Sequence, residues 1–290
     1  MGPLVDVPGT DDVQGESPIW SQREQALYWV DTRGYMIRRM DFASGKITSW
    51  KMPELPCSLV LRQSGGLLIA METCIVTFDT ASGEIVERIP APHKPDAGMR
   101  FADGRCDRRG RFWVGAKHDA TSGPIGILYR FDPDRKFTPT ETGIGHPNSL
   151  AWSPDNRTMY FADSADLAIR AYPYDVESGT IGARRHFAKC VAHPDGAAMD
   201  EEGYLWSAQY WGSSVVRYAP DGSIEREIKM PCSLITACTF GGPNMDRLYI
   251  TTARQLKHIT AEDLVKQPLA GRLFSIDVGI RGLPETAFAG

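Results

Sequence analysis

The feature that most constrains the fold is a phrase repeated six times along the chain. Each copy is an apolar strand with a large, mostly aromatic side chain near its middle, at Tyr28, Leu68, Trp113, Tyr160, Trp206 and Tyr249. Successive copies lie 40, 45, 47, 46 and 43 residues apart. A repeat of about 40–50 residues with strand character is typical of a propeller blade. The sequence therefore predicts an all-β, six-bladed β-propeller in a single domain over residues 1–290.

Regular turns separate the predicted strands. Residues 41–46 and 79–84 are near copies of one another, with Asp leading and Gly allowing a positive φ, as hairpin turns require. A second class of turn precedes the repeated strands, so each blade is expected to have two hairpins and four antiparallel strands. One short helix is predicted at 260–266, with Thr260 as its N-cap, and a loop is predicted at 91–95.

Four blades have an oxygen-bearing side chain where the first strand should begin. Counting back 10 to 12 residues from the repeated aromatic position leads to Glu16, Asp103, Asn148 and Asp195. Each could simply be a turn residue before a strand. Their common spacing favours a site instead, because the innermost strand of every blade lines the central channel. The other two blades have Cys57-Ser58 and Ile235-Thr236 at this place.

Carboxylates gathered in a narrow channel would repel one another and raise one another's pKa unless a cation held them. Oxygen ligands without Cys or His suit a hard divalent ion. The sequence thus predicts one divalent metal ion in the channel. Its identity stays open among Ca²⁺, Mg²⁺, Mn²⁺, Zn²⁺ and Fe²⁺.

Composition excludes several classes of partner. The net charge of −4 indicates neither a nucleic-acid nor a membrane-surface protein, and no apolar run approaches the roughly 18 residues of a membrane span. The six cysteines lack metal-site spacing, which favours buried thiols in a reducing compartment. With no leader-like segment after Met1, we expect a cytoplasmic protein that is a monomer or a weak homo-oligomer.

Several motifs resemble the senescence-marker-protein/gluconolactonase family, the regucalcin-like sugar lactonases. They are Gly15-Glu16-Ser17-Pro18-Ile19-Trp20, Arg100-Phe101-Ala102-Asp103-Gly104, Asn148-Ser149-Leu150-Ala151-Trp152-Ser153, Pro194-Asp195-Gly196, Cys238-Thr239-Phe240-Gly241-Gly242 and Gln267-Pro268-Leu269-Ala270-Gly271. The resemblance covers nearly the whole chain and implies a six-bladed propeller with one divalent metal. It also implies that Glu16, Asn148 and Asp195 are the metal ligands.

The chain departs from the family at one position. Family members with the arginine motif usually read Arg-x-Asn-Asp-Gly, and the amide side chain lies at the metal or the substrate. Here that position is Ala102. The substitution removes a hydrogen-bonding amide from the expected substrate site, whereas the three metal ligands are retained.

The expected reaction is hydrolysis of a small-molecule sugar lactone, an aldono- or aldarolactone, to the free acid. A divalent ion polarises a carbonyl, and the resemblance suggests Asp195 as the base that activates water. Arg100 and Asp103 would orient sugar hydroxyls, or Arg100 would bind a substrate carboxylate. Lys117 and His118 would add to a preference for a substrate that carries a carboxylate.

Two other functions fit the same residues. One is a phosphotriesterase or another ester hydrolase on the same scaffold, and the other is a non-enzymatic calcium-binding protein. A serine hydrolase has no support because the chain lacks a G-x-S-x-G motif. Tyr210 and Trp211 follow a repeated strand, where a loop could bend over the channel mouth and contact a ligand.

Overall fold

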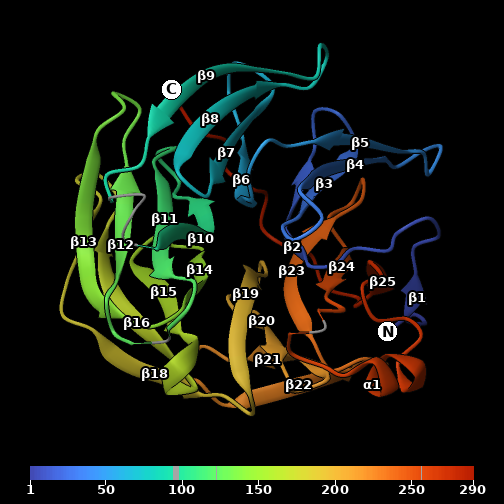
Figure 1. Ribbon diagram of the computed structural model, residues 1–290. Helices are drawn as coiled ribbons and strands as arrows, with labels where there is room; N and C mark the ends of the chain where they lie inside the picture. Colours follow the sequence, from blue (N-terminus) through green and yellow to red (C-terminus); the bar gives the residue numbers. More distant parts are fainter. Residues whose placement is uncertain (94–97, 122, 256) are drawn as a thin grey trace.

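The computed structural model describes residues 1–93, 98–121, 123–255 and 257–290. Six antiparallel sheets stand around a central channel, as Figure 1 shows in a view along it. This arrangement confirms the predicted six-bladed β-propeller. The first three blades comprise β2 (Gly15–Ser21), β3 (Ala26–Asp31), β4 (Met36–Asp41) and β5 (Ile47–Lys51); β6 (Pro56–Leu61), β7 (Leu67–Met71), β8 (Cys74–Asp79) and β9 (Glu84–Pro90); β10 (Met99–Cys106), β11 (Phe112–His118), β12 (Gly126–Phe131) and β13 (Phe137–Ile144).

The other three blades follow the same plan with two variations. In the fourth blade the outer edge is split, because two short strands both pair with β16. In the sixth blade the outermost strand comes from the N-terminal end of the chain. These blades comprise β14 (Pro147–Trp152), β15 (Thr158–Asp163), β16 (Ala168–Asp175), β17 (Thr180–Ile181) and β18 (Arg185–Lys189); β19 (His193–Met199), β20 (Leu205–Tyr210), β21 (Ser214–Tyr218) and β22 (Ile224–Lys229); β23 (Ile235–Gly241), β24 (Arg247–Thr252), β25 (Phe274–Asp277) and β1 (Val5–Asp6).

The repeated position lies in the second strand of each blade, where Trp113 and Trp206 occupy it and Trp29 adjoins Tyr28. Trp29, Trp113 and Trp206 are fully buried, as expected for packing residues. Each indole N–H donates to a buried aspartate, over 2.8–2.9 Å. Asp107 and Asp200 directly precede the strand of their tryptophan, whereas Asp12 precedes β2. Each aspartate also forms an ion pair with an arginine of its own blade. The aspartate thus satisfies the indole N–H that each tryptophan places in the core, and the arginine balances the aspartate's charge.

Both ends of the chain help to close the ring of blades. The β1 strand pairs with β25 and completes the sixth blade, so residues from opposite ends of the sequence share one sheet. The C-terminal segment 283–289 runs past the turns that follow the first strands, where Leu283, Phe288 and Ala289 donate backbone hydrogen bonds to three different blades.

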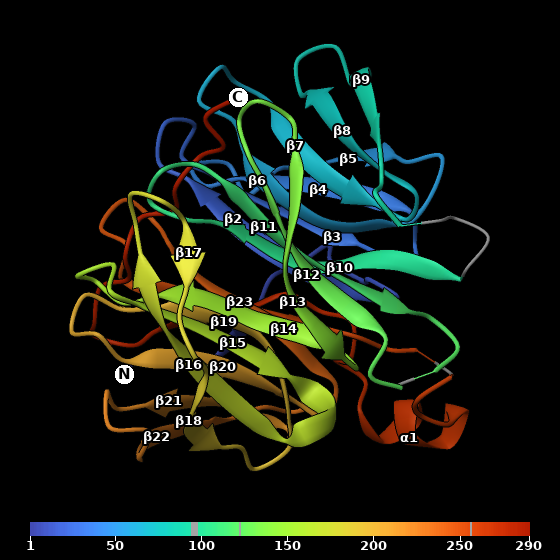
Figure 2. The same ribbon diagram turned by 90° about the vertical axis from the view of Figure 1, so that its left-hand side faces the viewer.

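The helix α1 (Ala261–Lys266) begins at Thr260, whose hydroxyl and backbone form a capping box with Asp263. The helix predicted at 260–266 is thus present, between β24 and β25, and Figure 2 shows it at one face of the ring. The predicted loop at 91–95 extends past residue 93 into positions outside the described residues. No helix in the described part of the chain is long and apolar enough to cross a membrane. All six cysteines are buried and unpaired, as expected.

Every first strand contains a one-residue irregularity in its pairing with the second strand. The register shifts lie between Glu16 and Ile19, Phe101 and Gly104, Asn148 and Ala151, and Pro194 and Ala197, with counterparts in β6 and β23. A bulge of this kind bends a strand and re-aims its side chains. The bulges in β2, β10, β14 and β19 lie where Glu16, Asp103, Asn148 and Asp195 face the channel.

Candidate active site

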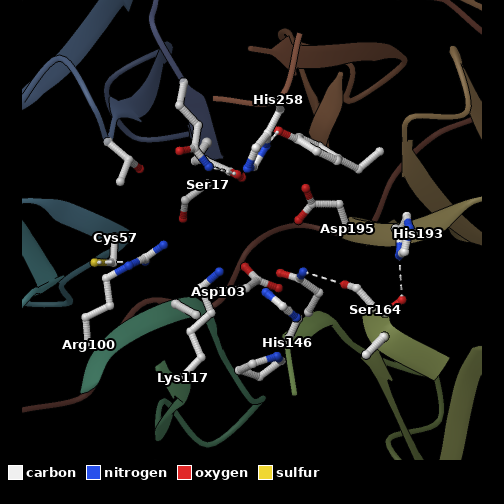
Figure 3. Close-up of a pocket in the computed structure, with 18 of the residues that line it drawn as sticks. Ser17, Cys57, Arg100, Asp103, Lys117, His146, Ser164, His193, Asp195 and His258 are labelled. Carbon is white, nitrogen blue, oxygen red and sulfur yellow. Dashed lines mark hydrogen bonds between the residues drawn. The ribbon is translucent and has the colours of Figure 1, made fainter. Parts of the chain in front are cut away.

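A cavity of about 390 Å³ opens at the end of the channel where the first strands begin. This volume suits a small polar ligand such as a sugar derivative. Figure 3 shows Asp195, Asp103, Arg100 and Lys117 in this cavity. Of the residues predicted from the sequence, it is lined by Glu16, Arg100, Ala102, Asp103, Lys117, Asn148 and Asp195.

The Asn148 side chain is held by a short chain of hydrogen bonds. Its Nδ2 donates to Ser164 Oγ over 2.7 Å, and Ser164 Oγ donates to the backbone carbonyl of Pro194 over 2.6 Å. Ser164 begins the short 3₁₀ helix η2 (Ser164–Asp166) just after β15. Because the amide nitrogen is used in this way, the amide oxygen remains available as an acceptor toward the cavity.

The four oxygen-bearing residues do not share one position in the blade register. Glu16 and Asn148 lie just before their bulges, Asp195 lies one residue later and Asp103 two residues later. The prediction of a single equivalent place is thus wrong by one or two residues. The reason is that the bulges differ: Ser17 and Ser149 have positive φ angles of 49° and 56°, whereas the residues around Asp103 and Asp195 do not.

The three carboxyl groups of the cavity affect one another. Burial raises the pKa of Glu16 to about 7, with Gln14 donating an opposing hydrogen bond and Asp103 adding to the rise. Burial, Glu16 and Asp103 raise the pKa of Asp195 well above its usual range. The pKa of Asp103 is also raised by burial. Three carboxyl groups in one cavity thus resist ionisation unless positive charge is supplied.

These residues fit a divalent cation. Glu16 and Asp195 offer carboxylate oxygens, and Asn148 offers the amide oxygen left free by its bond to Ser164. Oxygen donors of this kind suit hard cations. Among the described residues no group of three or more His, Cys, Asp or Glu side chains is arranged to hold a metal. The donor set of Glu16, Asn148 and Asp195 accordingly contains two carboxylates and one amide.

Arg100 is fixed by Asp119 just after β11, by Cys57 on β6 and by the carbonyl of Phe101 on its own strand. Its Nε donates to Asp119 over 2.7 Å, and its Nη1 donates to Cys57 Sγ and to the carbonyl of Phe101. Asp119 also accepts from Arg33 through both carboxylate oxygens, at 3.0 and 2.9 Å. Burial would raise the pKa of Asp119, but the two arginines outweigh it and hold this pKa well below its usual range.

Asp103 lies on the deeper side of the cavity. It faces the charge of Arg105, whose guanidinium pairs with Glu285 over 3.3 Å and donates to backbone carbonyls of the fourth and fifth blades. The C-terminal segment therefore contributes a charge beneath the site.

His118 is not among the residues that line the cavity, contrary to the expectation that it contacts substrate. It follows Lys117 on β11, and successive side chains of a strand point to opposite faces. Its Nδ1 accepts instead from the backbone N–H of Ala120, over 3.1 Å.

The structure adds residues that the sequence reasoning did not assign. Asp119 and Ser164 position predicted residues through side-chain bonds that only tertiary structure reveals. Tyr210 and Trp211 line the cavity, as considered from the sequence, and the Tyr210 hydroxyl is hydrogen-bonded to His258 Nδ1. His146 and His193 also line it. Burial, with Lys117 next in effect, lowers the pKa of His146 to about 4.

Comparison with known proteins places this geometry among related folds. The family model described as "SMP-30/Gluconolactonase/LRE-like region" matches residues 14–254. The chain is 37% identical over 282 residues to the Pseudomonas putida protein named 6-deoxy-6-sulfogluconolactonase, with 96% of each chain covered. It is 33% identical to pentonolactonase XacC of Haloferax volcanii, with 93% of each covered. The structure of a calcium-binding protein, regucalcin, from Agrobacterium tumefaciens superposes with a TM-score of 0.93 at 26% identity, covering 100% of this chain and 98% of that one.

Proposed function

The chain belongs to the SMP-30/gluconolactonase/LRE-like family, and we propose that it is a metal-dependent hydrolase that opens a sugar lactone to the free sugar acid. Relatives similar along almost their whole length are named as lactonases. The observation that carries the proposal is the cluster of Glu16, Asn148 and Asp195 in a cavity of about 390 Å³. Burial and mutual repulsion raise the pKa values of its two carboxyl groups, which supports the presence of a cation that would favour their ionised forms.

Glu16, Asn148 and Asp195 would hold the divalent ion. When bound, such an ion supplies Lewis-acid polarisation of the lactone carbonyl and stabilises the charge that develops on its oxygen. Asp195 accepts the proton of the attacking water. The water oxygen bonds to the carbonyl carbon, the ring C–O bond breaks, and the proton passes to the departing ring oxygen, so the product is an open-chain hydroxy acid.

Asp103 would position substrate hydroxyls, and Arg100 would contact either a hydroxyl or a carboxylate of the substrate. Asp103 accepts a long hydrogen bond from Leu150 N–H, at 3.4 Å, which leaves its carboxylate able to accept from a substrate hydroxyl. Arg100 is held in place by Asp119 and so presents its remaining edge without reorganising. Ala102 supplies only a methyl group beside them.

The test is acid release from freshly prepared aldono- and aldarolactones, followed with a pH indicator. The protein is first treated with a chelator, and Ca²⁺, Mg²⁺, Mn²⁺, Zn²⁺ and Fe²⁺ are then added back singly. We expect turnover that depends on one or more of these ions. Metal binding without turnover of any lactone would overturn the proposal and favour a calcium-binding role or another ester substrate, including phosphotriesters.

We also propose that the protein works in the cytoplasm. The support is that its six cysteines are buried and unpaired, which suits a compartment that keeps thiols reduced. Fractionation of cells producing the protein would test this, and recovery outside the cytoplasm would contradict it.

A further inference from the structure

Two cationic side chains that line the cavity lie directly opposite each other in one blade. Arg100 on β10 and Lys117 on β11 are Cα partners in the antiparallel ladder. Side chains of directly opposite residues share one face of the sheet, and like charges there are destabilising. Both residues line the cavity, and Figure 3 shows Lys117 between Arg100 and His146.

The existing ion pairs satisfy Arg100 only in part. Its Nε and Nη1 have acceptors in Asp119, Phe101 and Cys57, whereas its Nη2 has none among the described residues. Asp119 must also serve Arg33, so one carboxylate is shared by two guanidinium groups. The Arg100 side of the pair thus keeps both positive charge and a free donor.

The positive charge of Lys117 is compensated even less than that of Arg100. Its ammonium forms no hydrogen bond or ion pair with any residue in the described part of the chain. Burial, with Arg100 next in effect, lowers the pKa of Lys117 to about 8. Glu16 and Asp195 feel the charge of Lys117 at longer range, but they are the carboxylates already assigned to the metal ion.

We propose that Lys117 and the free Nη2 edge of Arg100 together bind a carboxylate at the far end of the lactone. Two separate donors suit the two oxygens of a carboxylate, and a bound anion removes the repulsion between the cations. This inference rests on the proposed lactone hydrolysis and narrows its substrate to the monolactone of a sugar diacid. It also makes Lys117, whose ammonium has no hydrogen-bond or ion-pair partner among the described residues, a specificity-determining residue.

The experiment compares two lactones of one ring size, glucaro-1,4-lactone and glucono-1,4-lactone, which differ at the terminal carboxylate. Wild-type protein should prefer the carboxylate-bearing lactone, and Lys117→Met should lower the ratio of the two kcat/KM values by about tenfold or more, mainly through KM. Lys117→Arg should retain part of the preference. Lys136→Met, an exposed lysine on the outside of the ring, is the matched control and should keep the wild-type ratio.

A binding measurement separates this inference from the proposed function. Calorimetry on chelator-treated, desalted protein should show glucarate binding more tightly than gluconate, with the difference lost in Lys117→Met. If no lactone is hydrolysed but this difference is found, the proposed function fails and the carboxylate site stands. If lactones are hydrolysed and Lys117→Met leaves the kcat/KM ratio unchanged, the carboxylate site is refuted. This holds whether the substitution lowers kcat/KM equally for both lactones or for neither.

Discussion

Asp195 illustrates how a carboxyl group depends on its surroundings in this site. The residue is 8% exposed, and its backbone carbonyl accepts a hydrogen bond from the Ser149 hydroxyl of the neighbouring blade. The ionised form of Asp195 is the one that binds a cation and accepts a proton, and burial disfavours that form. The same burial that raises its pKa therefore makes the site dependent on added positive charge.

Replacing Asp195 by alanine should reduce lactone turnover by more than about a thousandfold, because one change removes both a metal ligand and the base. The measurement is kcat/KM at saturating metal, with folding checked by circular dichroism. Asp134→Ala, at an exposed turn, serves as the control. A folded Asp195→Ala variant with a near-normal rate would refute the assignment of the base.

Glu16 should make the metal-free protein less stable as pH rises. Its carboxyl pKa is 4.5 when exposed and about 7 when folded, so between these values the folded state retains a proton that the unfolded state has lost. The stabilisation is complete below pH 4.5 and is lost as pH rises through 7. The loss amounts to about 3 kcal/mol in the free energy of unfolding.

Urea unfolding of chelated protein between pH 5 and pH 8 measures this effect. Glu16→Gln cannot titrate, so its free energy of unfolding should rise relative to wild type as pH increases, whereas the exposed Glu262→Gln should follow wild type. Adding the metal should remove the difference in slope. Parallel pH profiles for Glu16→Gln and wild type in the absence of metal would contradict the prediction.

The strands show how one motif is adapted to different tasks. All six first strands carry a bulge, but its local backbone differs between blades. In the fifth blade Gly196 follows Asp195, and β19 lies against β23 so closely that an added Cβ would be 2.3 Å from the Cβ of Ala237. Glycine is required here by the close approach of two strands.

Gly196→Ala should therefore destabilise the protein by about 1–3 kcal/mol through overpacking. Because the residue adjoins Asp195, we also expect lower lactone turnover. Gly123→Ala is the matched control, since its added Cβ would be in ordinary contact, 3.4 Å from Thr121 Oγ1. Equal free energies of unfolding for the two variants would show that the strands can separate without cost.

The ring as a whole is closed from both ends of the chain. The β1 strand seals the sixth blade, and the C-terminal segment crosses to the second, third and fifth blades. Phe288 anchors this segment: it is 2% exposed, stacks on Phe131 with ring centroids 5.5 Å apart, and exchanges backbone hydrogen bonds with Leu61 and Gln63. The same segment carries Glu285, the partner of Arg105 beneath the site.

Phe288→Ala should lower the free energy of unfolding by about 3–5 kcal/mol, because it leaves a cavity where the segment meets two blades. Urea unfolding is the measurement, and Val265→Ala, which trims an exposed side chain of α1, is the control. A loss below about 1 kcal/mol would mean that the segment contributes little to ring closure.

Much of the architecture could be predicted because it is local and repeated. The spacing of Tyr28, Trp113 and Trp206 reflects a blade that must bury the same face each time, and the Asp-to-Gly turns reflect backbone geometry within a few residues. The capping box at Thr260 is likewise complete within one turn of helix. These features can be predicted from the sequence because the residues that form them lie close together along the chain.

Contacts between distant residues could not be predicted in this way. The repeat spacing predicted that Glu16, Asn148 and Asp195 would share one cavity. Their one-residue difference in register could not be predicted, because it depends on the φ angles within each bulge. Asp119 binds Arg33 across 86 residues, and Arg100 faces Lys117 only because two strands pair in one register. The sequence by itself determined the repeat, the turns and the residue types that gather in the channel. Tertiary structure alone decided which charges are paired and which remain open to a ligand, because pairing depends on distances between segments that the order of residues does not encode locally.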